Sequence, residues 1–410
     1  MRTDLAAFIK DSPAGREADA ILRKCVHCGF CAATCPTYQL LGDELDGPRG
    51  RIYLIKQVLE GHPATEKTQL HLDRCLTCRA CETTCPSGVQ YGRLLDIGRH
   101  LVDARVPRKL PAALLRRLLR AVIPQRARFA LLLRLGQQLR ALLPTALARK
   151  IPHRAAAGEW PQSRHARRML VLDGCAQPSL SPATNAAAAR VLDRLGITLE
   201  RAAAAGCCGA LSQHLDAQDE ALDQMRRNVD VWWPAIDNGI EAIVMTASGC
   251  GVMVADYGRL LAHDPAYAEK AARVSALSKD ISEIIASEIP VIKAMLAGHA
   301  RHANVPISFH APCTLQHGLG MKGRVEALLG ELGFTLTGVA DSHLCCGSAG
   351  TYSILQPALS QRLLANKIKA LTAGKPAAIV TANIGCQSHL QSATALPVKH
   401  WIELLDARLA

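Results

Sequence analysis

Residues 25–36 read CVHCGFCAATCP, and residues 75–86 read CLTCRACETTCP. Both stretches have the spacing C-x2-C-x2-C-x3-C-P, and each cysteine of the second lies fifty positions after its counterpart in the first. This spacing is typical of ligands to a pair of [4Fe-4S] clusters. A pair of zinc sites is the alternative, but zinc favours two C-x2-C pairs around each ion.

The spacing assigns these eight cysteines to two crossed sites, because the fourth cysteine of each run lies beyond reach of the cube that its own run encloses. One site takes Cys25, Cys28, Cys31 and Cys85, and the other takes Cys75, Cys78, Cys81 and Cys35. Residues 50–61 and 91–102 place apolar side chains at helical spacing. The sequence therefore predicts a helical two-cluster ferredoxin-type domain over residues 1–100, suited to conducting single electrons and without catalytic residues.

The composition limits the classes of protein to which this sequence can belong. The chain has 410 residues, enough for two or three domains, and 49% of them are hydrophobic, which allows a packed core. Residues 1–23 carry charges and lack the apolar stretch of a signal peptide, and no run of 18 apolar residues predicts a membrane-spanning helix. We expect a cytoplasmic protein whose sixteen cysteines are metal ligands rather than disulfides.

Positive charge is concentrated in residues 101–168, which contain sixteen Lys and Arg but only two acidic residues, in a chain of net charge +13. This cysteine-free segment contains two apolar stripes at helical spacing, with arginines beside them. The stripes are Leu114, Leu115, Leu118, Leu119 and Val122, and then Phe129, Leu132, Leu135, Leu139 and Leu143. Such helices suit an anionic membrane surface or an acidic partner subunit, although solvated helices share the pattern. Nucleic acid is disfavoured, because only 4% of residues are aromatic.

The other eight cysteines form a second duplication in residues 169–410. Cys175, Cys207, Cys208 and Cys250 recur as Cys313, Cys345, Cys346 and Cys386, with an offset of 138 for the first three and 136 for the last. Residues 169–172, 240–246, 305–309 and 377–381 are apolar runs that predict strands, and residues 186–195 and 324–332 have helical patterns. The pattern predicts two α/β repeats with parallel sheets, over residues 169–300 and 301–410, whose cysteines lie on loops beyond the strand ends.

Each cysteine pair is followed by a glycine, Gly209 or Gly347. Glycine permits a positive φ, so the turn can direct both neighbouring sulfurs at one centre. These cysteines are therefore candidates for a further metal or redox site in each repeat. A vicinal disulfide and plain buried thiols are the alternatives.

The second repeat is richer in histidine. It contains His310, His317, His343 and His389, where the first repeat has Leu172, Ser179, Ala205 and Met253. Imidazoles beside cysteines can ligate metal, donate hydrogen bonds to sulfur or carry protons. We therefore expect the second repeat to hold the chemically active site, with His389 as a further candidate ligand; four unrelated histidines are the alternative.

A dinucleotide fingerprint, Gly318-x-Gly320-x-x-Gly323, stands alone in the second repeat. The fingerprint requires its first glycine directly after a strand, and residues 311–317 intervene here. We therefore expect this chain to hold no flavin or nicotinamide.

Paired ferredoxin runs followed by two CCG repeats resemble the iron–sulfur subunits of heterodisulfide reductase, anaerobic glycerol-3-phosphate dehydrogenase and glycolate oxidase. The resemblance covers nearly the whole chain and is closest to the glycolate oxidase (glycolate dehydrogenase) iron–sulfur subunits. It is carried by residues 25–31, 36–50, 174–178, 343–350 and 381–389. The last motif of each repeat departs from the family's C-x2-C, since it reads Cys250-x-x-Met253 or Cys386-x-x-His389.

The resemblance implies an α+β multidomain protein that serves as the electron-transfer subunit of a multi-subunit oxidoreductase. Partner subunits would carry FAD and oxidise glycolate to glyoxylate. This chain would hold two [4Fe-4S] clusters, and further iron–sulfur at the CCG repeats, and would pass electrons toward a quinone-like acceptor at the cytoplasmic face of the inner membrane. The alternatives are the corresponding subunit of an anaerobic glycerol-3-phosphate or lactate dehydrogenase, or a non-catalytic metal-bound scaffold.

Overall fold

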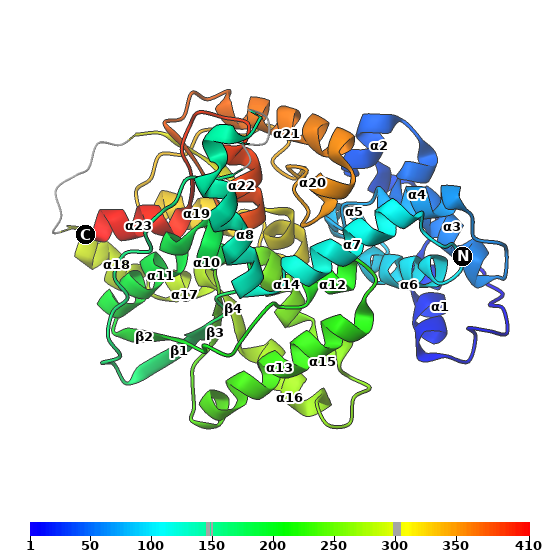
Figure 1. Ribbon diagram of the computed structural model, residues 1–410, viewed down its shortest axis with the longest axis horizontal. Coiled ribbons are helices and arrows are strands. Elements are labelled where there is room, and N and C mark those ends of the chain that lie inside the picture. Colours follow the sequence, from blue (N-terminus) through cyan, green and yellow to red (C-terminus); the bar gives the residue numbers. More distant parts are fainter. Residues whose placement is uncertain (145–147, 149–150, 298–304) are drawn as a thin grey trace.

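The computed structural model describes residues 1–144, 148, 151–297 and 305–410. Figure 1 shows a helical N-terminal part at one end of the molecule, two α/β repeats at the other, and a pair of helices that runs across both. The mixed helical and parallel-sheet architecture confirms the predicted α+β fold class.

The N-terminal part is helical throughout, as predicted. Its elements are α1 (Pro13–Lys24), η1 (Phe30–Ala32), α2 (Pro36–Leu41), η2 (Glu44–Asp46), α3 (Pro48–Leu59), α4 (Glu66–Asp73), α5 (Ala80–Thr84) and α6 (Tyr91–Asp103). The two predicted helices, α3 and α6, pack closely, because a Cβ at Gly98 would lie only 2.5 Å from Ile55 Cγ1. The cysteines lie on the short loops between these helices and at helix ends, except Cys31 in η1 and Cys81 in α5.

The basic segment forms α7 (Leu110–Val122), α8 (Arg126–Gln138) and the turn η3 (Arg140–Leu142). In α7 two of the three arginines, Arg116 and Arg120, turn toward the protein, while Arg117 and most leucines are exposed to solvent. An ordinary surface helix buries its leucines instead. Arg116 pairs with Asp73 at 3.1 Å, and Arg120 pairs with Glu220 at 2.9 Å. Leu114 and Leu118 are 63% and 56% exposed.

The first repeat is a parallel sheet of order β2-β1-β3-β4 with helices around it. Its strands are β1 (Arg167–Val171), β2 (Ile197–Arg201), β3 (Ile243–Met245) and β4 (Ser278–Asp280). Its helices are α10 (Gln177–Leu180), α11 (Pro182–Arg194), α12 (Ala210–His214), α13 (Gln218–Asp237), α14 (Ser248–Ala255), α15 (Tyr257–Leu260), α16 (Ala268–Leu277), α17 (Ile281–Ser287) and α18 (Ile289–Ala297). The predicted strands before Cys175 and Cys250 are β1 and β3.

The second repeat has a smaller parallel sheet of order β5-β6-β7. Its strands are β5 (Ile307–His310), β6 (Ala378–Thr381) and β7 (Val398–His400). Its helical elements are η4 (Thr314–Gly318), α19 (Arg324–Glu331), α20 (Tyr352–Leu355), α21 (Pro357–Thr372), α22 (Ile384–Gln391) and α23 (Trp401–Leu409). Leu336 makes a single parallel bridge to Ile307, at the place that β2 occupies in the first repeat.

The two repeats share one hydrophobic core. Val171 and Ile197 of the first repeat belong to the same buried cluster as Phe309, Val380 and Trp401 of the second. This shared core holds the two sheets, and hence their cysteine loops, in a fixed relative position. In the part of the chain that the structure describes, no helix combines the length and apolar character needed to cross a bilayer.

Candidate metal centres

The first predicted cluster site brings cysteines from both runs together. Cys25, Cys28, Cys31 and Cys85 line one pocket. Burial, followed by the neighbouring Cys25 thiol and then by Cys85 and Cys28, raises the pKa of Cys31 to about 11. The thiols therefore lie close enough to repel one another as thiolates, an arrangement that a cationic iron cluster relieves. Cys28 is exposed, so this site opens to the surface.

The second predicted site is enclosed. Burial, followed by the Cys78 and Cys75 thiols, raises the pKa of Cys81, and Cys35 acts in the same direction. The hydroxyl of Tyr91 and the backbone N–H of Thr77 donate to Cys75 Sγ at 3.6 and 3.4 Å. Cys35 of the first run thus lies near three cysteines of the second run, an arrangement that suits the predicted crossed pair of sites.

The second site lies against the second α/β repeat. Burial, followed by the Cys313 thiol, raises the pKa of Cys78, and the Cys78 thiol in turn acts to raise the pKa of Cys345. Leu76 and Cys78 pack into one apolar cluster with Cys313, Cys345 and Tyr352. Two thiol sites that are distant in sequence are therefore adjacent in the fold.

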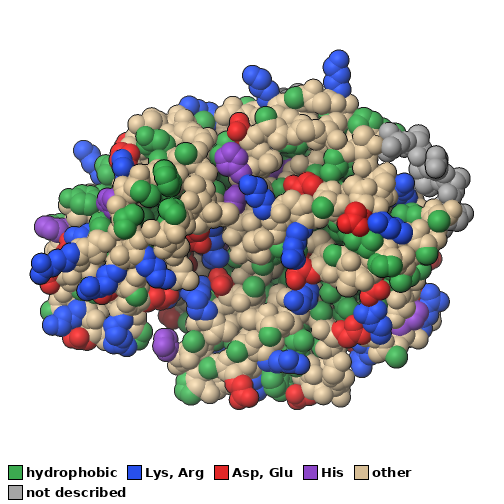
Figure 2. All heavy atoms as spheres, turned by 180° about the vertical axis from the view of Figure 1, so that it is seen from behind, with side chains coloured by type: hydrophobic (Ala, Val, Ile, Leu, Met, Phe, Trp, Pro, Cys, Tyr) green, Lys and Arg blue, Asp and Glu red, His purple; other side chains and the backbone are tan. Residues whose placement is uncertain are grey.

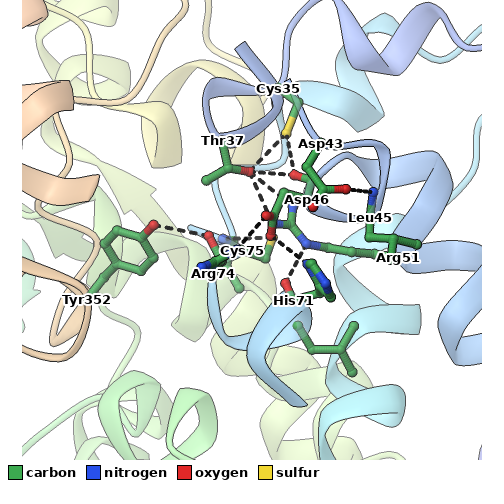
Figure 3. A network of polar contacts seen from close by, with 12 residues as sticks. Cys35, Thr37, Asp43, Leu45, Asp46, Arg51, His71, Arg74, Cys75 and Tyr352 are labelled. Carbon is green, nitrogen blue, oxygen red and sulfur yellow. Dashed lines mark hydrogen bonds and ion pairs between the residues drawn. The ribbon is translucent and has the colours of Figure 1, made fainter. Parts of the chain in front are cut away.

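A buried polar network borders the second site (Figure 3). Asp46 is fully buried and pairs with Arg74 at 2.8 Å and with Arg51 at 3.3 Å. The hydroxyl of Thr37 donates to the Asp46 carbonyl at 2.7 Å and lies 3.3 Å from Cys35 Sγ. The Asp46 carboxylate also contacts His71 Nδ1 at 3.1 Å, and because both its oxygens already face guanidinium groups, it is not free to bind a cation.

The cysteines of the first repeat follow β1, β2 and β3 in the chain. Cys175, Cys207 and Cys208 lie on loops as predicted, whereas Cys250 lies in the first turn of α14, so the prediction of a loop was wrong there, as it was for Cys386 in α22. The hydrogen bond with Cys207, and then burial, raises the pKa of Cys175, while Cys207 and Cys250 hold the pKa of Cys208 high. Arg126 of α8 donates to the Gly174 and Ala205 carbonyls at 3.1 and 3.3 Å, which fixes α8 over this site. The buried, apolar side chains of Leu172 and Met253 lie in the surroundings of this cysteine site.

The cysteines of the second repeat occupy the equivalent strand ends. Cys313 Sγ and Cys345 Sγ are 4.0 Å apart. Ligand atoms of His310, Cys346 and Cys386 all lie within 4.8 Å of one another, and all three residues are buried. Gly209 and Gly347 adopt φ of 93° and 90°, so the predicted left-handed turn after each cysteine pair is present.

The four histidines of the second repeat have separate positions. His310 lies among the cysteines. His389 Nε2 is 3.2 Å from the hydroxyl of Ser360, which itself donates to the Gly347 carbonyl beside the cysteine pair. His317 instead contacts Thr83 of the N-terminal part at 2.9 Å. The structure therefore places His310 among the candidate ligands, while the predicted candidate His389 contacts Ser360.

Sequence reasoning missed two buried cations beside these sites. Arg51 lies on the core-facing side of α3, one turn before Ile55. The helical pattern of the sequence therefore could have placed this arginine on the buried face. Lys367 is 3% exposed and donates to the Asp341 carbonyl, and burial lowers its pKa while the Cys345 and Cys346 thiols oppose that shift. Lys367 also falls on the apolar face of its helix, because Leu363 and Leu371 lie one turn before and after it in α21.

Comparison with known proteins finds matches to two families. Residues 21–89 match the family described as 4Fe-4S dicluster domain, and residues 169–255 and 307–391 match the family described as cysteine-rich domain. The glycolate oxidase iron–sulfur subunit of Escherichia coli K12 is 57% identical over 410 residues, which cover all of this chain and 99% of that protein. The chain belongs to the family of glycolate oxidase iron–sulfur subunits. It is accordingly an iron–sulfur protein.

More distant relatives share parts of this pattern. A probable glycolate oxidase iron–sulfur subunit of Bacillus subtilis 168 is 29% identical and covers 89% of this chain and 87% of its own length. Lactate utilization protein A of Geobacillus kaustophilus is 24% identical over 54% of this chain and 91% of that protein. The family identification confirms the predicted resemblance.

Proposed function

We propose that this chain is the electron-transfer subunit of a flavin-dependent glycolate dehydrogenase, whose partner subunits carry FAD and oxidise glycolate to glyoxylate. The observation that supports this most is the sequence of sites from the surface inward. The exposed site at Cys28 is followed by the enclosed site at Cys78, which adjoins Cys313 of the second repeat. Two bound [4Fe-4S] clusters supply one-electron transfer. The protein's own residues would set the distance between the two clusters and shield them from solvent.

We place the contact with the flavin partner at the open end of the first site. Val26 and Phe30 flank Cys28 and are 68% and 61% exposed. Figure 2 shows Lys and Arg side chains gathered over the end of the molecule that the N-terminal helices form. An apolar centre with a charged surround is the usual composition of a protein interface, and docking here minimises the distance to the first site.

The test is purification of the native complex under anaerobic conditions, followed by dye reduction with glycolate, lactate or glycerol 3-phosphate. We expect reduction with glycolate, and we expect Phe30→Glu to abolish it while leaving chemical reduction by dithionite intact. Val291→Glu is the control, because Val291 is 44% exposed far along the chain on α18. Reduction with lactate or glycerol 3-phosphate but not with glycolate would refute the substrate assignment.

We further propose that α7 and α8 rest on the cytoplasmic face of the inner membrane, near a quinone-like acceptor. Arg116 and Arg120 of α7 pair with the protein's own acidic residues, and the exposed leucines of α7, α8 and η3 form an apolar surface that no described residue covers. These leucines are Leu110, Leu114, Leu118, Leu131, Leu132, Leu135, Leu139 and Leu142. An apolar helical surface with arginines beneath it favours insertion into the headgroup region of a bilayer.

Replacing Leu114, Leu118, Leu131 and Leu135 with glutamine should release the protein from membranes. Each leucine contributes about 1.5–3 kcal/mol when buried, so four should shift the bound-to-free ratio by well over tenfold. The measurement is flotation with inner-membrane lipid vesicles. Val291→Gln combined with Ile354→Gln, two exposed apolar residues elsewhere, is the control. Unchanged flotation of the leucine variant would exclude membrane contact through these helices.

We also propose that the second repeat holds a redox-active metal centre, built from Cys313, Cys345, Cys346 and Cys386 with His310. The adjacency to the second cluster site supports this role, and so do the close ligand atoms of His310, Cys346 and Cys386. The first repeat has leucine at position 172, where the second has His310. We assign to the first repeat a structural metal or thiol site rather than a step in electron transfer.

A further inference from the structure

Arg51 is a buried arginine beside the second cluster site. Its side chain is 1% exposed, and all three of its nitrogens donate hydrogen bonds. Nε donates to the His71 carbonyl at 2.7 Å, and the terminal nitrogens donate to Thr37 Oγ1 at 3.1 and 3.2 Å. The side chain therefore has one fixed position, as Figure 3 shows.

The network around Arg51 carries more positive than negative charge. One carboxylate, that of Asp46, faces two guanidinium groups, those of Arg51 and Arg74. Burying an excess charge costs several kcal/mol unless another charge offsets it. Burial lowers the pKa of Arg51, but the nearby Cys75, Tyr91 and Cys35 raise it, and the net direction is upward. Thr37 Oγ1 bonds the guanidinium and lies 3.3 Å from Cys35 Sγ, so the excess positive charge faces the second set of cysteines.

The first site has no equivalent buried cation among the residues that line its pocket. Arg49 lies at its rim, is 39% exposed, and pairs with Glu44 at 2.6 Å. An exposed, paired guanidinium is screened by solvent and contributes little to the electrostatic potential at a neighbouring cluster. Thus two neighbouring arginines of α3 face different sites, one screened and one buried.

We propose that Arg51, held in place by Asp46, raises the reduction potential of the cluster ligated by Cys35, Cys75, Cys78 and Cys81. The inference rests on the proposed function, from whose flavin partner the single electron comes. Reduction adds one negative charge to the cluster, no bond forms or breaks, and Arg51 keeps its proton throughout. A fixed buried cation stabilises the reduced form, because nearby charge is weakly screened in the protein interior. Arg51 is thus a positioning residue that makes the inner site the better electron acceptor.

The test is a mediator titration of the full-length protein, purified anaerobically with the clusters that it acquired in the cell, followed by EPR. Arg51→Gln should lower the reduced-to-oxidised ratio of the second cluster about tenfold at fixed potential, or about 59 mV for one electron. Arg51→Lys keeps the charge and should retain most of the wild-type potential. Arg49→Gln is the matched control on the same helix and should change neither cluster by a comparable amount.

Iron content shows whether each variant still holds both clusters. If Arg51→Gln loses the second cluster, the Arg74→Gln variant becomes the test of the proposal. Arg74 is 28% exposed, so its removal should lower the potential of the same cluster by a smaller amount. An unchanged potential in Arg51→Gln, or in Arg74→Gln where that variant decides, would overturn the proposal. The titration uses neither glycolate nor a partner subunit, so a wrong substrate assignment would leave its outcome unaffected.

Discussion

Replacing Cys85 with serine should remove the cluster bound by Cys25, Cys28 and Cys31, although Cys85 belongs to the other cysteine run. The pocket at the first site includes Cys85, and the Cys85 thiol acts on the pKa of Cys31. A cluster that loses one of four thiolates is displaced or converted, so we expect iron to fall from about eight atoms per chain at the two ferredoxin sites to about four. Iron analysis after anaerobic purification, with EPR of the reduced protein, measures this.

Double variants establish which cysteines share a cluster. Cys85→Ser combined with Cys28→Ser should lose no more iron than either single variant, because both ligands serve one cluster. Cys85→Ser combined with Cys78→Ser should lose nearly all the iron of the two ferredoxin sites. The opposite pattern would show that each run binds its own cluster and that the crossed assignment is wrong.

Replacing Cys346 with serine should interrupt electron transfer after the two clusters have been reduced. The second repeat adjoins the enclosed cluster site, and Cys346 lies with His310 and Cys386 in its candidate metal centre. In the intact complex, glycolate should still reduce both clusters, while transfer to a quinone analogue slows by at least about tenfold, a barrier increase of about 1.4 kcal/mol. Stopped-flow absorbance separates the two steps.

Cys208→Ser is the matched control, because Cys208 holds the same position in the first repeat. It should leave quinone reduction within about twofold of the wild-type rate, a difference in barrier below 1 kcal/mol. An equal loss in both variants would assign electron transfer to both repeats. No loss in Cys346→Ser would remove the second repeat from the pathway.

The cysteine pattern predicted the fold class, the helical N-terminal part and the strands before Cys175, Cys250 and Cys386, because ligand spacing and strand periodicity are local properties. The orientation of α7 was beyond such reasoning. Its leucine stripe suggests a buried face, but Arg116 and Arg120 turn inward to reach Asp73 and Glu220. Those acids are distant in sequence, and only the tertiary fold brings them within reach.

The surroundings of the cysteines were also only partly predictable. A charged residue at position 51, among the apolar positions of α3, is visible in the sequence, whereas its partner Asp46 becomes identifiable only when η2 packs against α3. Which of the four histidines lies among the cysteines depends on the strand ends. His310 is the last residue of β5 and so lies beside the cysteines, while His317 contacts the N-terminal part of the chain.

The enclosure of the second site constrains how the protein is assembled in the cell. Tyr352 donates to the Arg74 carbonyl at 3.1 Å, and Arg362 donates to the Leu40 carbonyl at 2.9 Å, so the second repeat closes over the loops that hold Cys35 and Cys75. A maturation factor can deliver iron to the exposed edge at Cys28 after folding is complete. Delivery to the inner site must precede this closure, which makes cluster insertion there a step in folding rather than a later addition.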